Sequence, residues 1–350
     1  MHADPAAGWV YPAQVSETAQ TPDLTCDVAV VGAGAAGLSG AVILAQAGRT
    51  VLVLDSGETR NRFDTHMRGF LSRDGLAPRE LVELGRAEVE RYGGVVLRAR
   101  VTGAAAVTGA RGAADDAASE ALTGPTRFEL SLDDGRTVRA RRLLLAMGLV
   151  DELPEVEGLA DFWGAAVFHC PYCRGCELTD ETVGVLASGP DAVVEAHLLL
   201  QWAQDVVLLT NETVTLDDAQ RHGLAARGIR VVDGAVAAVR GEDSERLSSV
   251  VLADGTELAC QALLVAPTTH PRRALLDDLG VAVHDEPDEE CVIVPTGRGR
   301  STDVPGVWAA GNLRDGNVQV IEAAADGLRA AIAINADLTE EDVEAVGGSF

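Results

Sequence analysis

The stretch CDVAVVGAGAAGLSGAVILAQAGRTVLVLD, from Cys26 to Asp55, decides the fold of this chain. A short apolar run rich in β-branched residues, Cys26–Val31, leads into the glycine-rich turn GAGAAG at Gly32–Gly37. An alanine-rich segment follows as far as Gly48, and a second apolar run, Thr50–Asp55, ends the stretch. The pattern predicts a strand, a turn, a helix and a second strand, in the order of a nucleotide-binding βαβ unit.

The three glycines of the turn have the spacing G-x-G-x-x-G, and each has a physical task. Gly32 permits a tight turn, Gly34 lets backbone N–H groups approach a pyrophosphate, and Gly37 lets the helix press on the strand. Asp55 ends the second strand, where a carboxylate accepts hydrogen bonds from both ribose hydroxyls. These residues predict a dinucleotide site, and by themselves they leave NAD and FAD both open.

A weaker version of the same pattern begins at Thr182. Strand Val183–Ala187, helix Ala192–Ala203 and strand Val206–Thr210 are predicted there, and an amphipathic helix at Val318–Asn335 closes the chain. We expect an α/β fold with two Rossmann-like, three-layer ββα nucleotide-binding domains, the second inserted in the first. The predicted limits are an arm at 1–23, the first domain at 24–152 and 285–350, and the inserted domain at 153–284.

Charge and composition narrow the classes of partner. The 28 basic and 54 acidic side chains sum to a net charge of −26, which repels polyphosphate, so nucleic acid and anionic membranes are poor partners. The sequence contains no lysine, which excludes any mechanism that needs one. The N-terminal residues show neither a basic n-region nor an apolar h-region, so we expect a cytoplasmic protein.

The segment FHCPYCRGCE, Phe168–Glu177, is the second informative stretch. Cys170 and Cys173 form a C-x-x-C pair, whose short loop lets a disulfide open and close reversibly. A helix N-terminus at this point and the adjacent Arg174 would both favour a thiolate. His169 is a candidate proton acceptor, whereas Arg174 cannot deprotonate usefully and would act as an electrostatic stabiliser.

Cys176 adds a third cysteine, and C-x2-C-x2-C also begins a ferredoxin-type cluster motif. The fourth cysteine of that motif is missing, because Asp180 stands in its place. A distant fourth ligand from Cys26, Cys260 or Cys291 stays open, although all three are better explained as buried small hydrophobic residues. We favour thiol chemistry over an iron–sulfur or zinc site and expect no metal. Cys176 itself is either a bystander or a third redox thiol.

Taken in order, these motifs resemble the thioredoxin-reductase-like pyridine nucleotide–disulfide flavoproteins. The matching segments are GAGAAG, DSGETRNRF (Asp55–Phe63), AMG-x5-P (Ala146–Pro154) and GVWAAGN (Gly306–Asn312). The resemblance implies FAD in the first site, a homodimer, and a redox pair in which Cys173 faces the flavin and Cys170 exchanges with substrate. It implies FAD contacts from Gly32, Gly34, Ala35, Ala36, Gly37, Asp55, Ser56, Arg60, Asn61, Gly148, Gly311, Asn312, Gln319 and Val320.

The second glycine loop departs from the pattern of that family. It reads ASGPDA over Ala187–Ala192, so alanine replaces the first glycine and Pro190 removes one backbone N–H. Glu212, beyond the next strand, would repel the 2′-phosphate of NADPH. We expect NADPH binding to be lost, while weak binding of NADH stays open.

The CPYC spelling, Asn312 in place of the family's usual aspartate, and the altered second loop resemble the dithiol oxidase branch of the family. That branch closes disulfides in natural products of the holomycin and gliotoxin types, and it has histidine where this chain has Arg174. The resemblance implies an FAD-dependent enzyme that oxidises a small-molecule dithiol and reduces O2 to H2O2. The alternatives are a disulfide reductase fed by NADH or ferredoxin, and a non-enzymatic flavin-binding redox sensor or partner protein.

Overall fold

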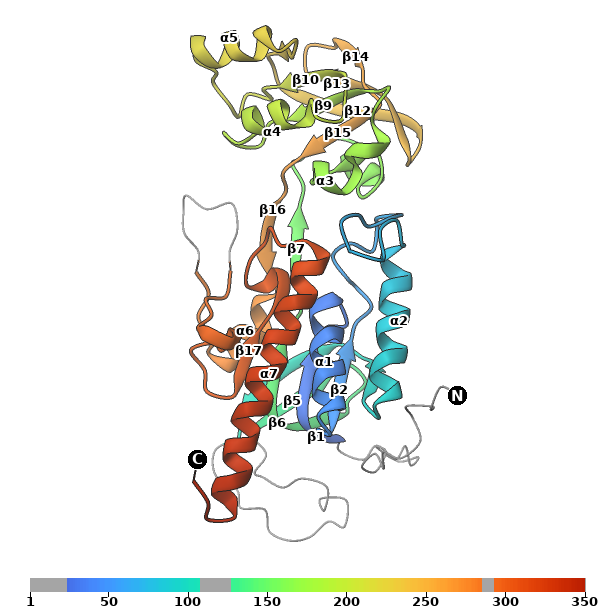
Figure 1. Ribbon diagram of the computed structural model, residues 1–350. Helices are drawn as coiled ribbons and strands as arrows, with labels where there is room; N and C mark the ends of the chain where they lie inside the picture. The colour runs from blue at the N-terminus through green and yellow to red at the C-terminus, as the bar shows by residue number, and fades with distance from the viewer. Residues whose placement is uncertain (1–23, 108–126, 285–292, 350) are drawn as a thin grey trace, which may run out of the picture. The chain divides into compact units, whose positions relative to one another are not determined.

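The computed structural model describes residues 24–107, 127–284 and 293–349, so the predicted arm and Cys291 lie outside the described residues. The described chain forms two compact units (Figure 1). Unit 1 contains residues 24–60, 79–150 and 270–349, and unit 2 contains residues 61–78 and 151–269. Relative to the predicted domain limits, residues 61–78 pack with unit 2 and residues 270–284 pack with unit 1.

Unit 1 is built on a seven-stranded sheet. Its strands are β1 (Leu24–Val31), β2 (Val51–Asp55), β3 (Val95–Arg98), β4 (Val101–Ala106), β5 (Phe128–Leu132), β6 (Thr137–Leu145) and β17 (Val307–Ala309). Their order is β3-β2-β1-β6-β5-β4, and β17 also pairs with β6. The pairs β3–β2, β2–β1, β1–β6 and β6–β17 are parallel, and β4, β5 and β6 pair antiparallel. The predicted strand–turn–helix–strand unit is therefore the centre of this sheet.

Hydrophobic side chains cover both faces of the sheet, because successive residues of a strand point to opposite sides. Val28 and Val30 belong to one buried cluster, with side chains of helices α1 (Ala35–Gln46) and α7 (Val320–Ala345). Ala29 and Val31 belong to a second cluster, which includes side chains of α6 (Arg273–Leu279). Helix α2 (Pro78–Arg91) contributes Val89 to the first cluster. The parallel strands are thus buried on both sides, as nearly continuous apolar runs require.

The closing helix differs from its prediction, because α7 ends at Ala345 rather than at Asn335. Its last turns are rich in acidic residues. In the structure, Glu341 Oε1 and Asp342 Oδ1 accept hydrogen bonds from Arg141 Nη2 of β6 at 2.8 and 2.6 Å. Arg141 is completely buried. The acidic end of the helix therefore balances a buried cation, which the sequence pattern alone did not reveal.

Unit 2 has a five-stranded parallel sheet in the order β11-β10-β9-β15-β8. An antiparallel sheet, β12-β13-β14, accompanies it. Helix α4, predicted to reach Ala203, ends at Leu199. The elements are β8 (Val167–Phe168), α3 (Pro171–Arg174), β9 (Thr182–Leu186), α4 (Ala192–Leu199), β10 (Asp205–Leu209), α5 (Asp218–Ala226), β11 (Arg230–Val232), β12 (Val236–Asp243), β13 (Arg246–Leu252), β14 (Glu257–Ala259) and β15 (Ala262–Val265).

The chain passes between the two units four times, after Arg60, Pro78, Val150 and Thr269, and the last two passages lie in β7 (Leu149–Glu152) and β16 (Thr268–Pro271). These two strands pair as a two-stranded sheet. Among the described residues, no helix has the length and apolar character needed to cross a membrane.

Candidate functional site

The first glycine loop of unit 1 has the tight geometry that its three glycines predict. Gly32 has φ of +105°, and a Cβ there would lie 2.4 Å from the Ala146 carbonyl oxygen. A Cβ at Gly37 would lie 1.9 Å from the Gly32 carbonyl oxygen, so α1 presses directly on the turn. At Gly34, by contrast, no described atom lies within 4 Å of such a Cβ. Gly34 therefore borders open space at the start of α1.

The start of α1 suits an anion. No side chain of the described residues caps its first turn, so the N–H groups at Ala35 and Ala36 stay available, as at any uncapped helix start. Asp55 is buried at the end of β2, and its Oδ1 accepts a hydrogen bond from the Gly57 N–H at 2.8 Å. Ser56 follows it directly. Open space, an uncapped helix start and a buried carboxylate at the strand end together fit a dinucleotide such as FAD.

The late motif GVWAAGN lies against the first glycine loop of unit 1. Gly311 has φ of +71°, and a Cβ there would lie 2.9 Å from the Ala36 Cβ, which puts this turn against the first turn of α1. Arg60 Nη1 donates a hydrogen bond to the Gly316 carbonyl at 2.7 Å, so Arg60 lies beside the loop that follows. Gly311, Arg60 and the first glycine loop are thus gathered on one side of unit 1.

The amide of Asn312 closes its own loop. Its Nδ2 lies 2.9 Å from the Gly316 carbonyl oxygen, 3.3 Å from that of Val318 and 3.4 Å from that of Asp315. An aspartate has no donor for any of these carbonyls. The amide therefore has a structural reason in this chain, beside its expected hydrogen bond to FAD.

Of the remaining predicted FAD contacts, some belong to unit 1 and one belongs to unit 2. Gln319 is the N-cap of α7 and forms a capping box with Glu322, and Val320 begins that helix. Gly148 follows β6 with φ of +62°. Asn61 packs with unit 2, so it is not part of the group of residues that unit 1 brings together.

The two cysteines of the C-x-x-C motif lie at a single helical turn of unit 2. β8 leads into this turn, Cys170 is its N-cap and Pro171 is its first residue. The Cys173 N–H donates to the Cys170 carbonyl at 3.1 Å, and the two Sγ atoms lie 2.8 Å apart. Cys170 is 8% exposed, while Cys173 is half-buried. The separation of the sulfurs allows a disulfide to form with a small movement. Which of the two exchanges with substrate stays a prediction.

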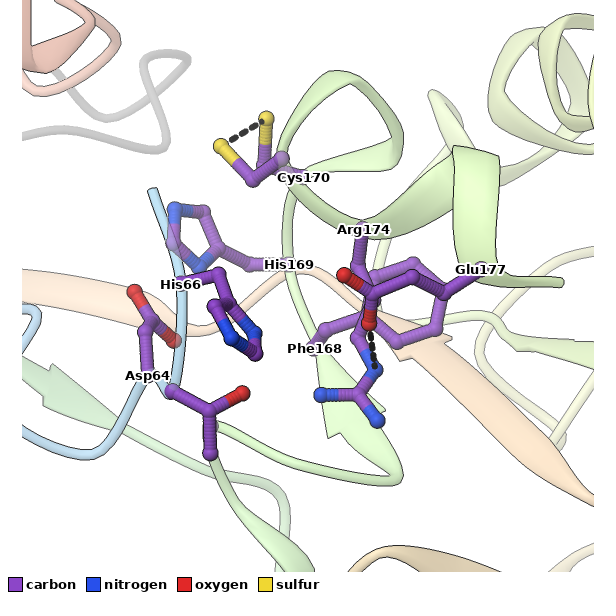
Figure 2. Close-up of a pocket in the computed structure, with 10 residues that line it drawn as sticks. Asp64, His66, Phe168, His169, Cys170, Arg174 and Glu177 are labelled. Atoms are coloured by element: carbon purple, nitrogen blue, oxygen red, sulfur yellow. Dashed lines mark hydrogen bonds and ion pairs between the residues drawn. The ribbon is translucent and has the colours of Figure 1, made fainter. Parts of the chain in front are cut away.

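A small pocket opens beside the cysteines, and Figure 2 shows the side chains around it. Two imidazoles, His169 and His66, lie next to one another there, with Asp64 beside them. His169 also stacks at a tilt on Trp163, with ring centroids 5.8 Å apart. The pocket is lined by Asp64, Thr65, His66, Gly164, Phe168, His169, Cys170, Cys173, Arg174 and Glu177.

Asp64 and His66 are absent from the predicted site. A usable signal was the polar run DTH in a loop with several glycines, a composition that suits a site as well as a surface turn. Nothing in the spacing from residue 66 to residue 170 indicates that the two would meet.

Arg174 lines the pocket, but its charge is shared between two carboxylates. Its Nε lies 3.9 Å from Glu177 Oε2, and its Nη2 lies 3.5 Å from Glu245 Oε2. Figure 2 shows the guanidinium extending toward Glu177 and away from the two sulfur atoms. Its predicted role as a stabiliser of a thiolate would therefore act at a distance and against these partners.

The other described cysteines differ sharply in exposure. Cys26 and Cys260 are buried, as predicted, and burial raises the pKa of Cys260 to about 11. Cys176 is exposed. Within the part of the chain that the structure describes, no group of three or more His, Cys, Asp or Glu side chains is arranged to hold a metal ion.

The second glycine loop does not repeat the geometry of the first. Ala187 is buried, its N–H donates to the Leu209 carbonyl at 3.0 Å, and its carbonyl accepts from Thr213 Oγ1 at 2.7 Å. Among the described residues, none from 187 to 192 has a positive φ, whereas Gly32 has φ of +105°. The N–H groups of Ala192 and Val193 donate back to the carbonyls of Gly189 and Pro190. This loop folds on itself and leaves few donors for a phosphate.

Comparison with known proteins gives consistent likenesses. Residues 26–327 match the family described as pyridine nucleotide-disulphide oxidoreductase. Thioredoxin reductase sirT of Leptosphaeria maculans is 29% identical over 332 residues, which cover 91% of this chain and 96% of that protein. The crystal structure of HlmI superposes with a TM-score of 0.80 at 40% identity, covering 93% of this chain and 95% of HlmI. The oxidoreductase from Agrobacterium tumefaciens gives 0.79 at 36% identity, covering 90% and 99%. The predicted two-domain Rossmann-like fold is confirmed.

Proposed function

The chain belongs to the pyridine nucleotide-disulphide oxidoreductase family, as a flavin-dependent enzyme that acts on thiols with FAD as cofactor, and from that premise we propose that it is a dithiol oxidase. Its substrate is a small molecule with two thiols, which it joins in an intramolecular disulfide. The electron acceptor is O2. The balanced reaction converts dithiol and O2 to disulfide and H2O2.

The observation that carries this proposal is the second glycine loop. A reductase of this family draws electrons from a nicotinamide nucleotide, which needs a phosphate cradle in the second domain. The loop at Ala187–Ala192 lacks the left-handed first residue, lacks the N–H of Pro190, and returns two further N–H groups to its own carbonyls. Electrons that cannot enter from NADPH are expected to come from the thiol substrate instead.

The residues of unit 2 can carry out the thiol exchange. A substrate thiolate attacks the Cys170 sulfur of a Cys170–Cys173 disulfide, and the electron pair of the broken S–S bond goes to the Cys173 sulfur. The second substrate thiolate then attacks the substrate sulfur of the mixed disulfide and releases Cys170. FAD, when bound, accepts the two electrons of the dithiol and passes them to O2. His169, which lines the pocket beside these sulfurs, accepts the proton of a substrate thiol.

The test is anaerobic mixing of the FAD-loaded protein with dithiothreitol, NADPH and NADH in separate stopped-flow runs. We expect the flavin absorbance to bleach with the dithiol and to recover, with formation of H2O2, when air is admitted. Cys170→Ser and Cys173→Ser should each abolish this bleaching. Cys176→Ser, outside the pair, decides between the two roles of Cys176: bleaching like the wild type makes it a bystander, and slower bleaching makes it a third redox thiol.

The named relatives favour one other candidate, a reductase, because sirT is called a thioredoxin reductase. Bleaching by NADPH or NADH that is faster than bleaching by the dithiol would establish the reductase and overturn the oxidase. A wild-type protein that holds FAD but responds to none of the three would point to a redox sensor or partner protein.

We also propose that the protein is a cytoplasmic homodimer. The support is the likeness to its family over nearly the whole chain. Light scattering of the purified FAD-loaded protein gives its mass directly, and a mass near 36.4 kDa, that of one chain, would contradict the dimer.

A further inference from the structure

The loop at residues 61–78 brings a second imidazole to the cysteine pocket, and we propose that His66, supported by Asp64, is a catalytic proton acceptor for the substrate thiols alongside His169. This inference rests on the proposed dithiol oxidase and names a further residue of its site. The following contacts, all within unit 2, carry it.

The loop is held firmly against the segment that follows the cysteines. Arg68 Nη2 lies 2.8 Å from Glu177 Oε1, and Met67 between His66 and Arg68 is buried. The Met67 N–H donates to the Leu76 carbonyl at 2.9 Å, and the Gly75 N–H donates to the Met67 carbonyl at 2.8 Å. Both bonds fix the backbone directly after His66, and before it the Asp64 N–H donates to the Asn61 carbonyl at 3.1 Å.

A second close contact fixes the start of the loop at residues 61–78. Gly164 has φ of +81°, and a Cβ there would lie 2.3 Å from the Phe63 Cβ and 2.8 Å from the Phe63 carbonyl carbon. Only glycine allows the loop to approach this closely. Gly164 also lines the pocket, so the close approach occurs where Asp64 and His66 enter it.

The order of the side chains suits proton movement. In Figure 2 the His169 ring lies next to the sulfur atoms, the His66 ring lies next to His169, and the Asp64 carboxylate lies beside both rings. His66 is exposed, whereas His169 is half-buried. Solvent therefore reaches the His66 ring directly, while Cys170 stays buried.

Charged groups of both signs surround the pocket. Its cations are compensated, since Arg68 pairs with Glu177 and with Asp74 at 3.6 Å, and Arg174 pairs with Glu177 and Glu245. Asp64, which lines the same pocket, places a carboxylate beside the two imidazoles. The groups that face His66 in the pocket and titrate or carry charge are Asp64, His169, Cys170, Cys173, Arg174 and Glu177.

Two thiols must lose protons in each turnover, and the pocket offers two imidazoles. The first thiol gives its proton to one imidazole, and its electron pair forms the bond to Cys170 as the Cys170–Cys173 bond breaks toward Cys173. The second thiol gives its proton to the other imidazole, its electron pair closes the substrate disulfide, and Cys170 leaves with the electron pair of the mixed disulfide. The two protons then return to the cysteine sulfurs, which completes the dithiol form.

The experiment compares His66→Gln, His169→Gln and the double variant with wild type, all loaded with FAD. The readout is the rate of anaerobic flavin bleaching by dithiothreitol between pH 6 and pH 10. Below a thiol pKa of about 8.5, loss of a proton acceptor should slow His66→Gln by about 10-fold or more, with a further loss in the double variant. Well above that pH the substrate ionises without help, so the rate of His66→Gln should approach that of wild type.

Each other outcome overturns a distinct statement. A His66→Gln rate equal to that of wild type at every pH would show that His66 has no role in the reaction. A rate that stays low even at pH 10 would show that its role is structural. Either result would contradict His66 as a proton acceptor. His222→Gln, on the exposed face of α5, is the matched control and should follow wild type throughout. If wild type itself is not bleached by the dithiol, the dithiol oxidase fails, and that result is separate from any effect of His66.

Discussion

Gly327 of α7 touches the backbone of Ala36 in the first turn of α1, since a Cβ at Gly327 would lie only 1.9 Å from the Ala36 carbonyl oxygen. Ala36 also lies against Gly311, so one point joins the first glycine loop, the late GVWAAGN motif and the closing helix. The predicted FAD site therefore depends on the packing of α7, which comes almost three hundred residues later in the chain.

We expect Gly327→Ala to force α7 away from α1, because the backbone oxygen at Ala36 cannot yield as a flexible side chain would. The variant should lose about 1–3 kcal/mol of stability and much of its bound FAD. The ratio of flavin to protein absorbance and a denaturant titration measure both. Gly223→Ala, inside α5 with only His197 Nε2 as near as 3.9 Å, should leave the FAD content unchanged, and a loss there equal to that of Gly327→Ala would contradict this account.

Gly34 separates the binding role of the first loop from its folding role. Because a Cβ at Gly34 meets no described atom within 4 Å, Gly34→Ala should fold and lose about 1 kcal/mol or less at this N-cap. The added methyl would occupy the space where the pyrophosphate is expected, so the dissociation constant for FAD should rise by at least tenfold. Fluorescence titration of the apoprotein with FAD checks this. In contrast, Gly32→Ala should reduce stability directly, because of its φ of +105°.

Asn312→Asp tests why this chain departs from the usual aspartate of its family. The exchange removes the amide donor to the carbonyls of Gly316, Val318 and Asp315 and places a carboxylate beside them. We expect a loss of about 1–3 kcal/mol and faster release of FAD. Unfolding in denaturant and the dissociation rate of FAD are the measurements. A variant as stable as wild type would show that the amide is not needed to close the loop.

Arg141 is the cation on which the end of α7 depends. It is fully buried and contacts Asp27 at 2.9 Å, as well as Glu341 and Asp342. Arg141→Met should destabilise the protein by about 3–5 kcal/mol, because three carboxylates lose their common partner. Arg139→Met, on the same strand, is the control: Arg139 pairs with Glu129 at an exposed site, where about 0–1 kcal/mol is expected. Equal losses in the two variants would contradict the importance of burial.

The same ion network predicts acid sensitivity. Burial alone would raise the pKa of Glu341, but hydrogen bonds from Arg142 and Arg141 outweigh it and hold this pKa below its ordinary value. A carboxyl with a depressed folded pKa contributes stability above its unfolded pKa and loses it as pH falls through the folded value. Stability should therefore decline as pH falls below 4.5, the ordinary value, and Glu341→Gln should show a shallower decline. Chemical unfolding at a series of pH values between 3 and 7 gives both slopes.

Local sequence was sufficient for the dinucleotide loop and for the cysteine pair. The turn at Gly32–Gly37 and the spacing of Cys170 and Cys173 involve residues that are neighbours along the chain. Their geometry follows from backbone freedom and short-range hydrogen bonds. The predicted strands around the first loop agree with β1 and β2 to within a few residues for the same reason.

Tertiary structure alone decided the rest of the site. It brought His66 and Asp64 to the cysteines and ended α7 where Arg141 needed acidic partners. It also folded the second glycine loop so that two of its N–H groups donate to carbonyls of the same loop. Each of these depends on charges and close contacts between residues far apart in the chain. The energy of such a contact depends on which groups lie beside a buried side chain. The spacing of residues along the sequence does not show which groups those are.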